Sequence, residues 1–163
     1  MLPSEERVYR MQQIRQLRLE LPYYNGQILA SEKKLKKYAE DYAKYNAALE
    51  QLTTVSKGIY DGKGDIDAGG KLLPNYAGGN KYGEAAGAIS AVSSMFGSVA
   101  SSGVGSIVKH VQTNMKSLND EYKKEHPNYL EAIEGYNKVV AQIKSLDGNA
   151  SFKEPTITKS SLA

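Results

Sequence analysis

Cysteine and tryptophan are absent from this chain of 163 residues, and histidine occurs only at positions 110 and 126. Without cysteine there are no disulfides and no thiolate sites for metal or redox chemistry. Two histidines also disfavour a multi-histidine metal site within one chain. The formal net charge of +3 is too small to indicate nucleic-acid binding, which requires a concentrated basic face. The sequence therefore predicts no cofactor, no metal and no specific nucleic-acid site.

Motifs of catalysis and nucleotide binding are missing as well. Residues 61–67, DGKGDID, begin like a calcium-binding loop, but Ile66 stands where the sixth position needs glycine. Residues 64–72 approach a phosphate-binding loop, but Leu72 stands where Ser or Thr would hold magnesium. No serine lies in a Gly-x-Ser-x-Gly elbow. We therefore expect a protein that is not an enzyme and has no catalytic residue.

The informative feature is a pair of heptad-patterned arms, in which apolar residues alternate in steps of three and four from Ile14 to Leu52 and from Val104 to Leu146. Such spacing places one stripe along a helix, and that stripe must be buried against another helix. The tyrosines in it can bury their rings while their hydroxyls reach the rim of the helix pair. The predicted seam, within the chain or shared with a second copy, contains Leu35, Tyr38, Tyr42, Tyr45, Leu49, Leu52, Met115, Leu118, Tyr122, Tyr129 and Tyr136.

The predicted fold class is all-α, either a long antiparallel helical hairpin or a folded-over helical bundle. Proline should kink or divide the first arm at Pro22 and kink or briefly break the second near Pro127, because it removes a backbone hydrogen bond and clashes with the preceding turn. Gly58 is expected to cap the first arm. One helical domain, 1–163, is predicted, divided into a first arm at 4–57, a Gly-rich irregular loop at 58–83, a small-residue apolar helix and second arm at 84–146, and an extended tail at 147–163 that docks on a partner or stays mobile.

A stretch of 24 residues, 85–108, carries no charge. A helix of that length can span a bilayer, since about 20 residues suffice, but the stretch has no Leu and is rich in Ser, Gly and Ala. Small residues at helical spacing allow close approach of helix backbones in membranes or in tight bundles. The predicted membrane-contacting or inter-helix residues are Ile89, Val92, Met95, Phe96, Val99, Val104 and Ile107.

Residues 86–100, AGAISAVSSMFGSVA, resemble the low-complexity apolar stretches of the internal virion, or DNA-ejection, proteins of tailed phages. The resemblance extends in composition to residue 108. It implies a helical, oligomeric virion component that is delivered into the host envelope to build a conduit.

Three functions are consistent with these patterns. The first is a structural component of an oligomeric assembly, a phage virion or ejection protein by the resemblance, whose apolar segment contacts membrane or lines a conduit. The second is a soluble helical adaptor or scaffold with a buried small-residue helix, and the third is a pore-forming or translocator protein. The partners expected are further copies of the chain and other subunits of the assembly. Because the acidic start at residues 1–6 lacks a signal peptide, the expected location is the virion, or the cytoplasm before assembly.

Overall fold

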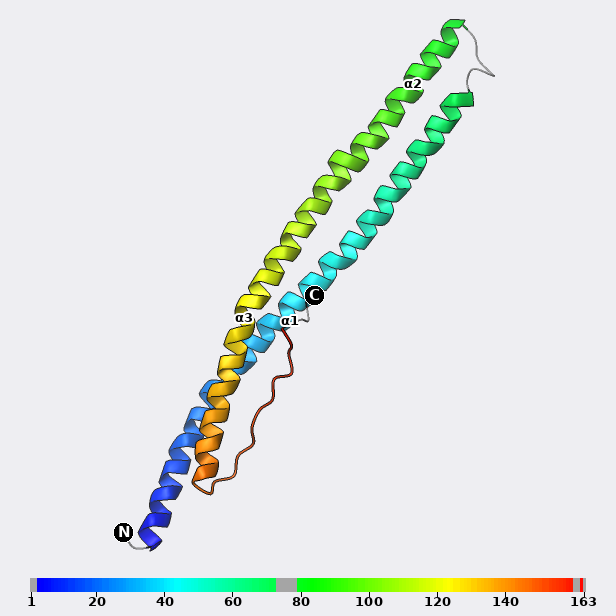
Figure 1. Ribbon diagram of the computed structural model, residues 1–163. Coiled ribbons are helices and arrows are strands. Elements are labelled where there is room, and N and C mark those ends of the chain that lie inside the picture. The colour runs from blue at the N-terminus through cyan, green and yellow to red at the C-terminus, as the bar shows by residue number, and fades with distance from the viewer. Residues whose placement is uncertain (1–2, 73–78, 160–161, 163) are drawn as a thin grey trace. The chain divides into compact units, whose positions relative to one another are not determined.

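The computed structural model describes residues 3–72, 79–159 and 162, with side chains from 3–72, 83–159 and 162. Over these residues the protein is all-helical, with two long helical stretches that pack against each other and no strands. Helix α1 spans Pro3–Leu72 (Figure 1). The second stretch is continuous through helix α2 at Gly79–Ser98, the π-helix η2 at Val99–Val104 and helix α3 at Gly105–Ser145. The predicted all-α class is confirmed.

Contacts group the chain into two compact units, each of which is described by itself. Unit 1 contains Met1–Tyr42 and Ser117–Ala163, and unit 2 contains Ala43–Lys116. That both belong to one domain stays a prediction.

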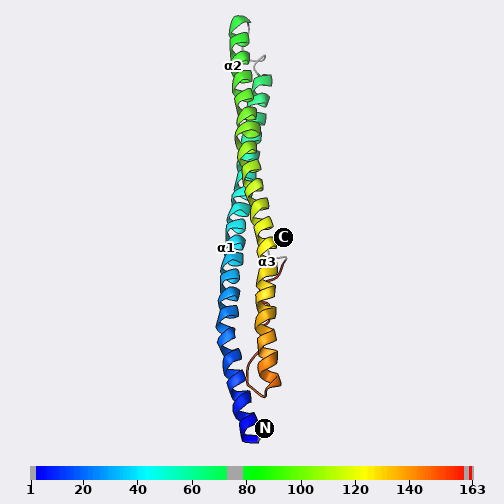
Figure 2. The same ribbon diagram turned by 90° about the vertical axis from the view of Figure 1, so that its left-hand side faces the viewer.

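In unit 1 the first part of α1 packs antiparallel on the second part of α3, and the two lie side by side in both views (Figures 1 and 2). Antiparallel direction follows from the contacts, because Ser31 meets Glu125 whereas the earlier Tyr24 meets the later Gly135. The buried core lies in this seam and is formed by Ile28, Leu35, Tyr122, Tyr129, Ala132, Ile133 and Leu162.

Both prolines lie inside their helices. The assigned α1 continues through Pro22 and α3 through Pro127, so neither residue ends a helix. The division of the first arm into two stacked helices at Pro22 was wrong, as was a short break near Pro127. The other predicted alternative, a kinked but continuous helix at each proline, stays a prediction. The seam residues on both sides of each proline are buried or half-buried, and this tertiary packing offsets the lost backbone hydrogen bond.

The predicted loop at 58–83 was also wrong. Residues 58–72 continue α1 and residues 79–83 belong to α2, while residues 73–78 lie outside the described part of the chain. The cause is visible in the burial pattern, because the three-four rhythm of half-buried positions continues past Leu52. Its later members are Ser56, Ile59, Lys63, Ile66 and Gly70. Gly58 is therefore a residue within the helix rather than its cap.

Glycine in this region serves close packing in unit 2. A Cβ atom on Gly62 would lie 3.1 Å from the ring of Phe96, and one on Gly70 would lie 3.1 Å from the Cγ2 methyl of Ile89. The apolar side chains of α2 thus lie directly on the backbone of α1. The glycines that suggest a loop by composition instead form the part of α1 on which the side chains of α2 pack.

The π-helix η2 has a physical reason in the sequence. Inner positions of α2, including Ser93 and Ala100, and those of α3, including Val104 and Val111, follow heptad frames that differ by one residue. The backbone N–H of Gly105 donates to the carbonyl of Ala100, a bond that spans five residues instead of four. The wider turn absorbs the extra residue, so both helices keep their small and apolar side chains on the buried face.

Candidate functional site

The uncharged stretch of α2, η2 and the start of α3 has two different apolar faces. Ile89 and Phe96 are half-buried against α1, and Val104 is buried. The other four predicted contact residues are exposed: Val92 by 42 %, Met95 by 65 %, Val99 by 52 % and Ile107 by 51 %. We call Val92, Met95, Val99 and Ile107 the apolar stripe.

The apolar stripe keeps to one side of the helix. Val92, Met95 and Val99 are spaced by three and four residues, and Ile107 follows eight residues later, which is one heptad plus the residue inserted by η2. The π-helix therefore returns Ile107 to the side of Val99. Without that insertion the stripe would end at Val99.

The side of the helix away from the apolar stripe is rich in exposed serines, among them Ser90, Ser94 and Ser101. The hydroxyl of Ser101 donates to the carbonyl of Gly97 over 2.8 Å, so its hydrogen bond is made within the helix. A serine that bonds its own helix presents little unsatisfied polarity to an apolar neighbour. The surface is amphipathic without any charge.

Among the described residues, the stretch from Gly83 to Ser145 contains a segment long and apolar enough to cross a membrane, judged by length and composition alone. Only 17 % of the most apolar 18-residue window is buried. A core helix of a soluble protein would bury most of this window. The exposed apolar surface therefore needs a different explanation.

Two Ser–carboxylate bonds join the helices, one in each unit. In unit 1 the Ser31 hydroxyl donates to Glu125 over 2.7 Å, and in unit 2 the buried Ser93 donates to Asp67 over 2.5 Å. Lys63 also donates to Asp67, at 3.0 Å. A single polar pair in an apolar seam fixes the register of two helices, because any shift leaves a buried polar group without its partner.

The Ser93 and Lys63 donors lower the pKa of Asp67 below its ordinary 3.8, with the Ser93 hydrogen bond as the larger cause. A lowered folded-state pKa stabilises the folded state above the unfolded pKa, and the contribution is lost as pH falls through the folded value. We expect Asp67→Asn to lower the melting temperature at neutral pH and to leave it close to wild type well below pH 3.8. Asp65→Asn, on an exposed carboxylate two residues away, is the matched control for circular dichroism melts. Equal losses in both variants at neutral pH would contradict this role of Asp67.

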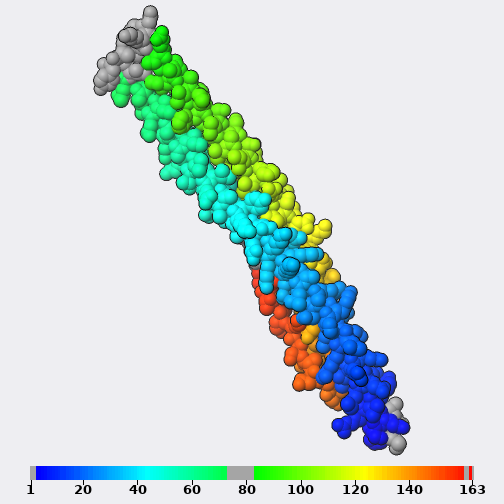
Figure 3. Space-filling view, turned by 180° about the vertical axis from the view of Figure 1, so that it is seen from behind, coloured from blue at the N-terminus to red at the C-terminus, as the bar shows by residue number. Residues whose placement is uncertain are grey.

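The C-terminal arm, residues 149–159 with Leu162, is extended and lies along α1 and α3 of unit 1 (Figure 3). The side chains of α3 bind its backbone. Tyr122 donates to the carbonyl of Thr158 over 2.6 Å, His126 donates from Nε2 to the carbonyl of Ile157 over 2.9 Å, and the N–H of Thr156 donates to the Tyr129 hydroxyl over 2.9 Å.

Further contacts hold the arm at both of its ends. The Asn137 amide pairs with both the N–H and the carbonyl of Lys153, at 2.7 and 2.8 Å. The Lys153 ammonium reaches Asn25 on α1, and Arg18 donates to the carbonyl of Asn149 over 3.1 Å. Leu162 is buried in the core of unit 1. In the described residues the arm docks on its own chain, and the two predicted alternatives for the tail, docking on a partner or mobility, stay predictions.

The structure places the predicted seam residues as follows. Leu35, Met115, Tyr122 and Tyr129 are buried, and Tyr38, Tyr42, Tyr45, Leu49, Leu52, Leu118 and Tyr136 are half-buried. The docking site of the arm was not predicted. Its only signal was the excess of tyrosine at seam positions, since a buried phenol needs a hydrogen-bond partner.

A comparison of the chain with protein-family models, with curated proteins and with solved structures finds no match.

Proposed function

We propose that this protein is a non-enzymatic structural component of an oligomeric assembly, and that its apolar stripe contacts a lipid bilayer. The observation that carries the proposal is the exposure of four large apolar side chains along an uncharged helical stretch. Contiguous exposed apolar surface marks protein or membrane contact sites. A single exposed apolar residue needs no explanation, because such residues are common on protein surfaces. A row of four that η2 keeps on one side of the helix does need one.

Lipid is favoured over a protein partner by three properties of the stretch. It carries no charge over 24 residues, it is long enough for a bilayer at about 1.5 Å per residue, and the described Ser101 satisfies its hydroxyl within the helix. A protein interface commonly adds charged or hydrogen-bonding groups at its rim. From residue 85 to the end of α2, the exposed side of the helix offers serine hydroxyls and no charge.

Flotation with neutral phosphatidylcholine vesicles tests the proposal. We expect the intact chain to float with the vesicles, and Val99→Asp to reduce partition on the order of 100-fold, since Asp in hydrocarbon costs roughly 2.5–3.5 kcal/mol. Ser94→Asp adds the same charge at an exposed position on the side of the helix away from the stripe and should float like wild type. Both variants should keep the wild-type helix content.

The dependence of vesicle binding on salt concentration distinguishes apolar contact through the stripe from electrostatic binding through lysines. Exposed lysines on α1, including Lys33, Lys36 and Lys37, could bind anionic lipid, but such binding weakens as salt screens the charges. Binding through the apolar stripe should be nearly independent of salt. The proposal is contradicted if the wild-type chain does not float with neutral vesicles, or if the Val99→Asp variant floats as well as the wild type. Either result would favour a soluble adaptor.

The finer features of the assembly are part of the same proposal. We propose a single antiparallel helical hairpin, supported by the antiparallel contacts found within each unit. The resemblance of residues 86–108 to tailed-phage internal virion proteins supports a virion as the assembly and a host envelope as the bilayer. Detection of the chain in purified particles tests that assignment.

A further inference from the structure

The turn between α3 and the C-terminal arm is tight and strained. Asp147 has φ 63°, a left-handed conformation that glycine adopts freely and that strains residues with a Cβ atom, Asp and Asn less than most. The N–H of Gly148 donates to the carbonyl of Ile143 over 2.9 Å, and a Cβ atom on Gly148 would lie 2.6 Å from the Cγ2 methyl of Ile143. The chain therefore reverses direction within Leu146–Gly148, with no room for a larger residue.

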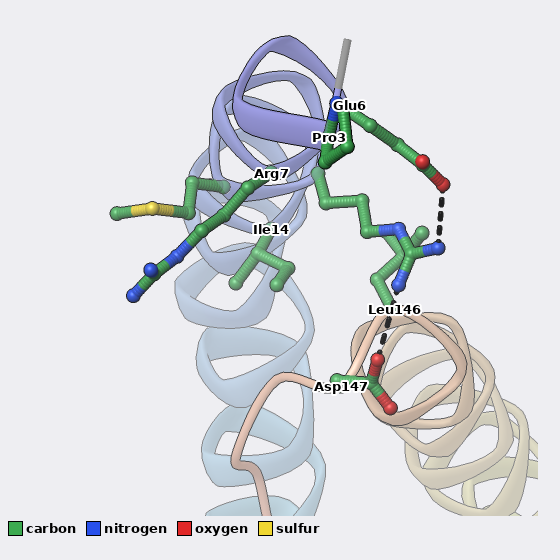
Figure 4. A pocket seen from close by; sticks show the side chains of 8 residues that line it. Pro3, Glu6, Arg7, Ile14, Leu146 and Asp147 are labelled. Carbon is green, nitrogen blue, oxygen red and sulfur yellow. Dashed lines mark hydrogen bonds and ion pairs between the residues drawn. The ribbon is translucent and has the colours of Figure 1, made fainter.

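An ion pair links this turn to the first residues of α1. Arg10 of α1 donates to Asp147 over 3.2 Å and to Glu6 over 2.7 Å (Figure 4). The Asp147 side chain is nevertheless 84 % exposed, so the ion pair is solvated and contributes little. The closed turn thus combines backbone strain at Asp147 with a weak ion pair to Arg10.

The arm carries no secondary structure of its own, and the surface of unit 1 specifies its path. The bonds of Tyr122, His126, Tyr129 and Asn137 go to backbone groups of the arm, and Leu162 fills the core. This face of unit 1 is in effect a binding site for an extended peptide that ends in an apolar anchor. Nothing in these contacts requires that the peptide belong to the same molecule.

We propose that two copies of this chain exchange their C-terminal arms, so that residues 149–159 and Leu162 of each copy dock on α1 and α3 of the other. Exchange preserves every docking contact and releases the strain at Asp147, because the turn can open when the arm crosses to a partner. Short strained hinges are the condition that favours such exchange. The inference rests on the self-association in the proposed function and is independent of the lipid contact.

The absence of native cysteine makes the exchange directly measurable. One full-length chain carries Asn25→Cys and the other carries Lys153→Cys, since these two side chains touch when the arm is docked. The two chains are mixed, refolded together and treated with a short bis-maleimide. Only contact between copies can join them.

We expect cross-linked dimers on a denaturing gel in about tenfold excess over a control mixture with Gln12→Cys in place of Asn25→Cys, because docking holds the two thiols at high effective concentration. Position 12 is exposed on the same helix, about 20 Å from position 25. Equal yields of dimer in the two mixtures would overturn the exchange. So would the absence of cross-linked dimer when a single chain that carries both cysteines forms an intramolecular cross-link.

Two hinge variants sharpen the outcome. Gly148→Ala strains the closed turn further and should raise the yield of dimers severalfold, whereas a Gly-Ser insertion after Asn149 relaxes it and should lower the yield. Identical yields in both variants would overturn the role of the strained turn. Vesicle flotation is read separately, so the loss of exchange and the loss of lipid binding are distinguishable.

Discussion

Leu35→Ala is expected to lower the free energy of unfolding by about 2–5 kcal/mol. The Leu35 side chain has no exposed surface and lies in the core of unit 1 among Ile28, Tyr122 and Tyr129. Its truncation removes buried apolar contacts and leaves a cavity that the two helices cannot close without shifting their whole seam. Urea unfolding followed by circular dichroism measures the loss as a lower transition midpoint.

Leu29→Ala is the matched control on the same helix. Leu29 is 55 % exposed, so the same chemical change should alter the unfolding free energy by less than about 0.5 kcal/mol. A similar loss in both variants would contradict the seam described here. It would indicate that the Leu29 side of α1 is buried in solution.

Tyr129→Ala is expected to cost about 3–5 kcal/mol and to release the C-terminal arm. The Tyr129 ring is fully buried, and its hydroxyl accepts from the Thr156 N–H and lies 3.4 Å from the Thr156 hydroxyl. The residue therefore belongs at once to the helix seam and to the docking site of the arm. Limited proteolysis should cut within residues 149–159 much faster than in the wild type.

Tyr129→Phe separates these two roles. It keeps the ring in the seam and removes only the hydroxyl, so the loss should be about 1–2 kcal/mol, with faster cutting in the arm. A Phe variant whose arm is cut at the wild-type rate would show that the Tyr129 hydroxyl does not hold the arm.

The helix seam was predictable because it depends on local periodicity alone. Every seam position of the two arms, from Ile14 to Leu52 and from Val104 to Leu146, is buried or half-buried in the structure. A stripe of apolar residues at a period of 3.5 has few ways to leave water other than by pairing with a second helix. The sequence contained this information regardless of how the units are arranged.

The prediction of a loop at residues 58–83 was wrong because it followed the glycine content of the region and not its helical periodicity. Glycine lowers helix propensity, so residues 58–83 suggest a loop when each residue is taken alone. The three-four rhythm of half-buried positions reaches Gly70 in the structure, but in the sequence only Ile59 and Ile66 among its later members are apolar. Packing of Phe96 on Gly62 supplies the tertiary support that propensity lacks.

Two other features could not be derived from side-chain patterns. A helical wheel with a uniform period places Val99 and Ile107 about 80° apart, whereas the residue inserted in η2 returns both to one exposed side. The arm is held largely through its backbone carbonyls, for example at Ile157 and Thr158, and backbone recognition leaves no pattern of residue types.

A single environment-sensitive fluorophore on the apolar stripe tests lipid contact at the side chain itself. The chain has no native cysteine, so Met95→Cys and Ser94→Cys each label one site, on and off the stripe. With neutral vesicles, we expect a blue shift at position 95 and no shift at position 94. An unchanged spectrum at position 95, or one already blue-shifted without vesicles, would contradict lipid contact and place that side chain against protein.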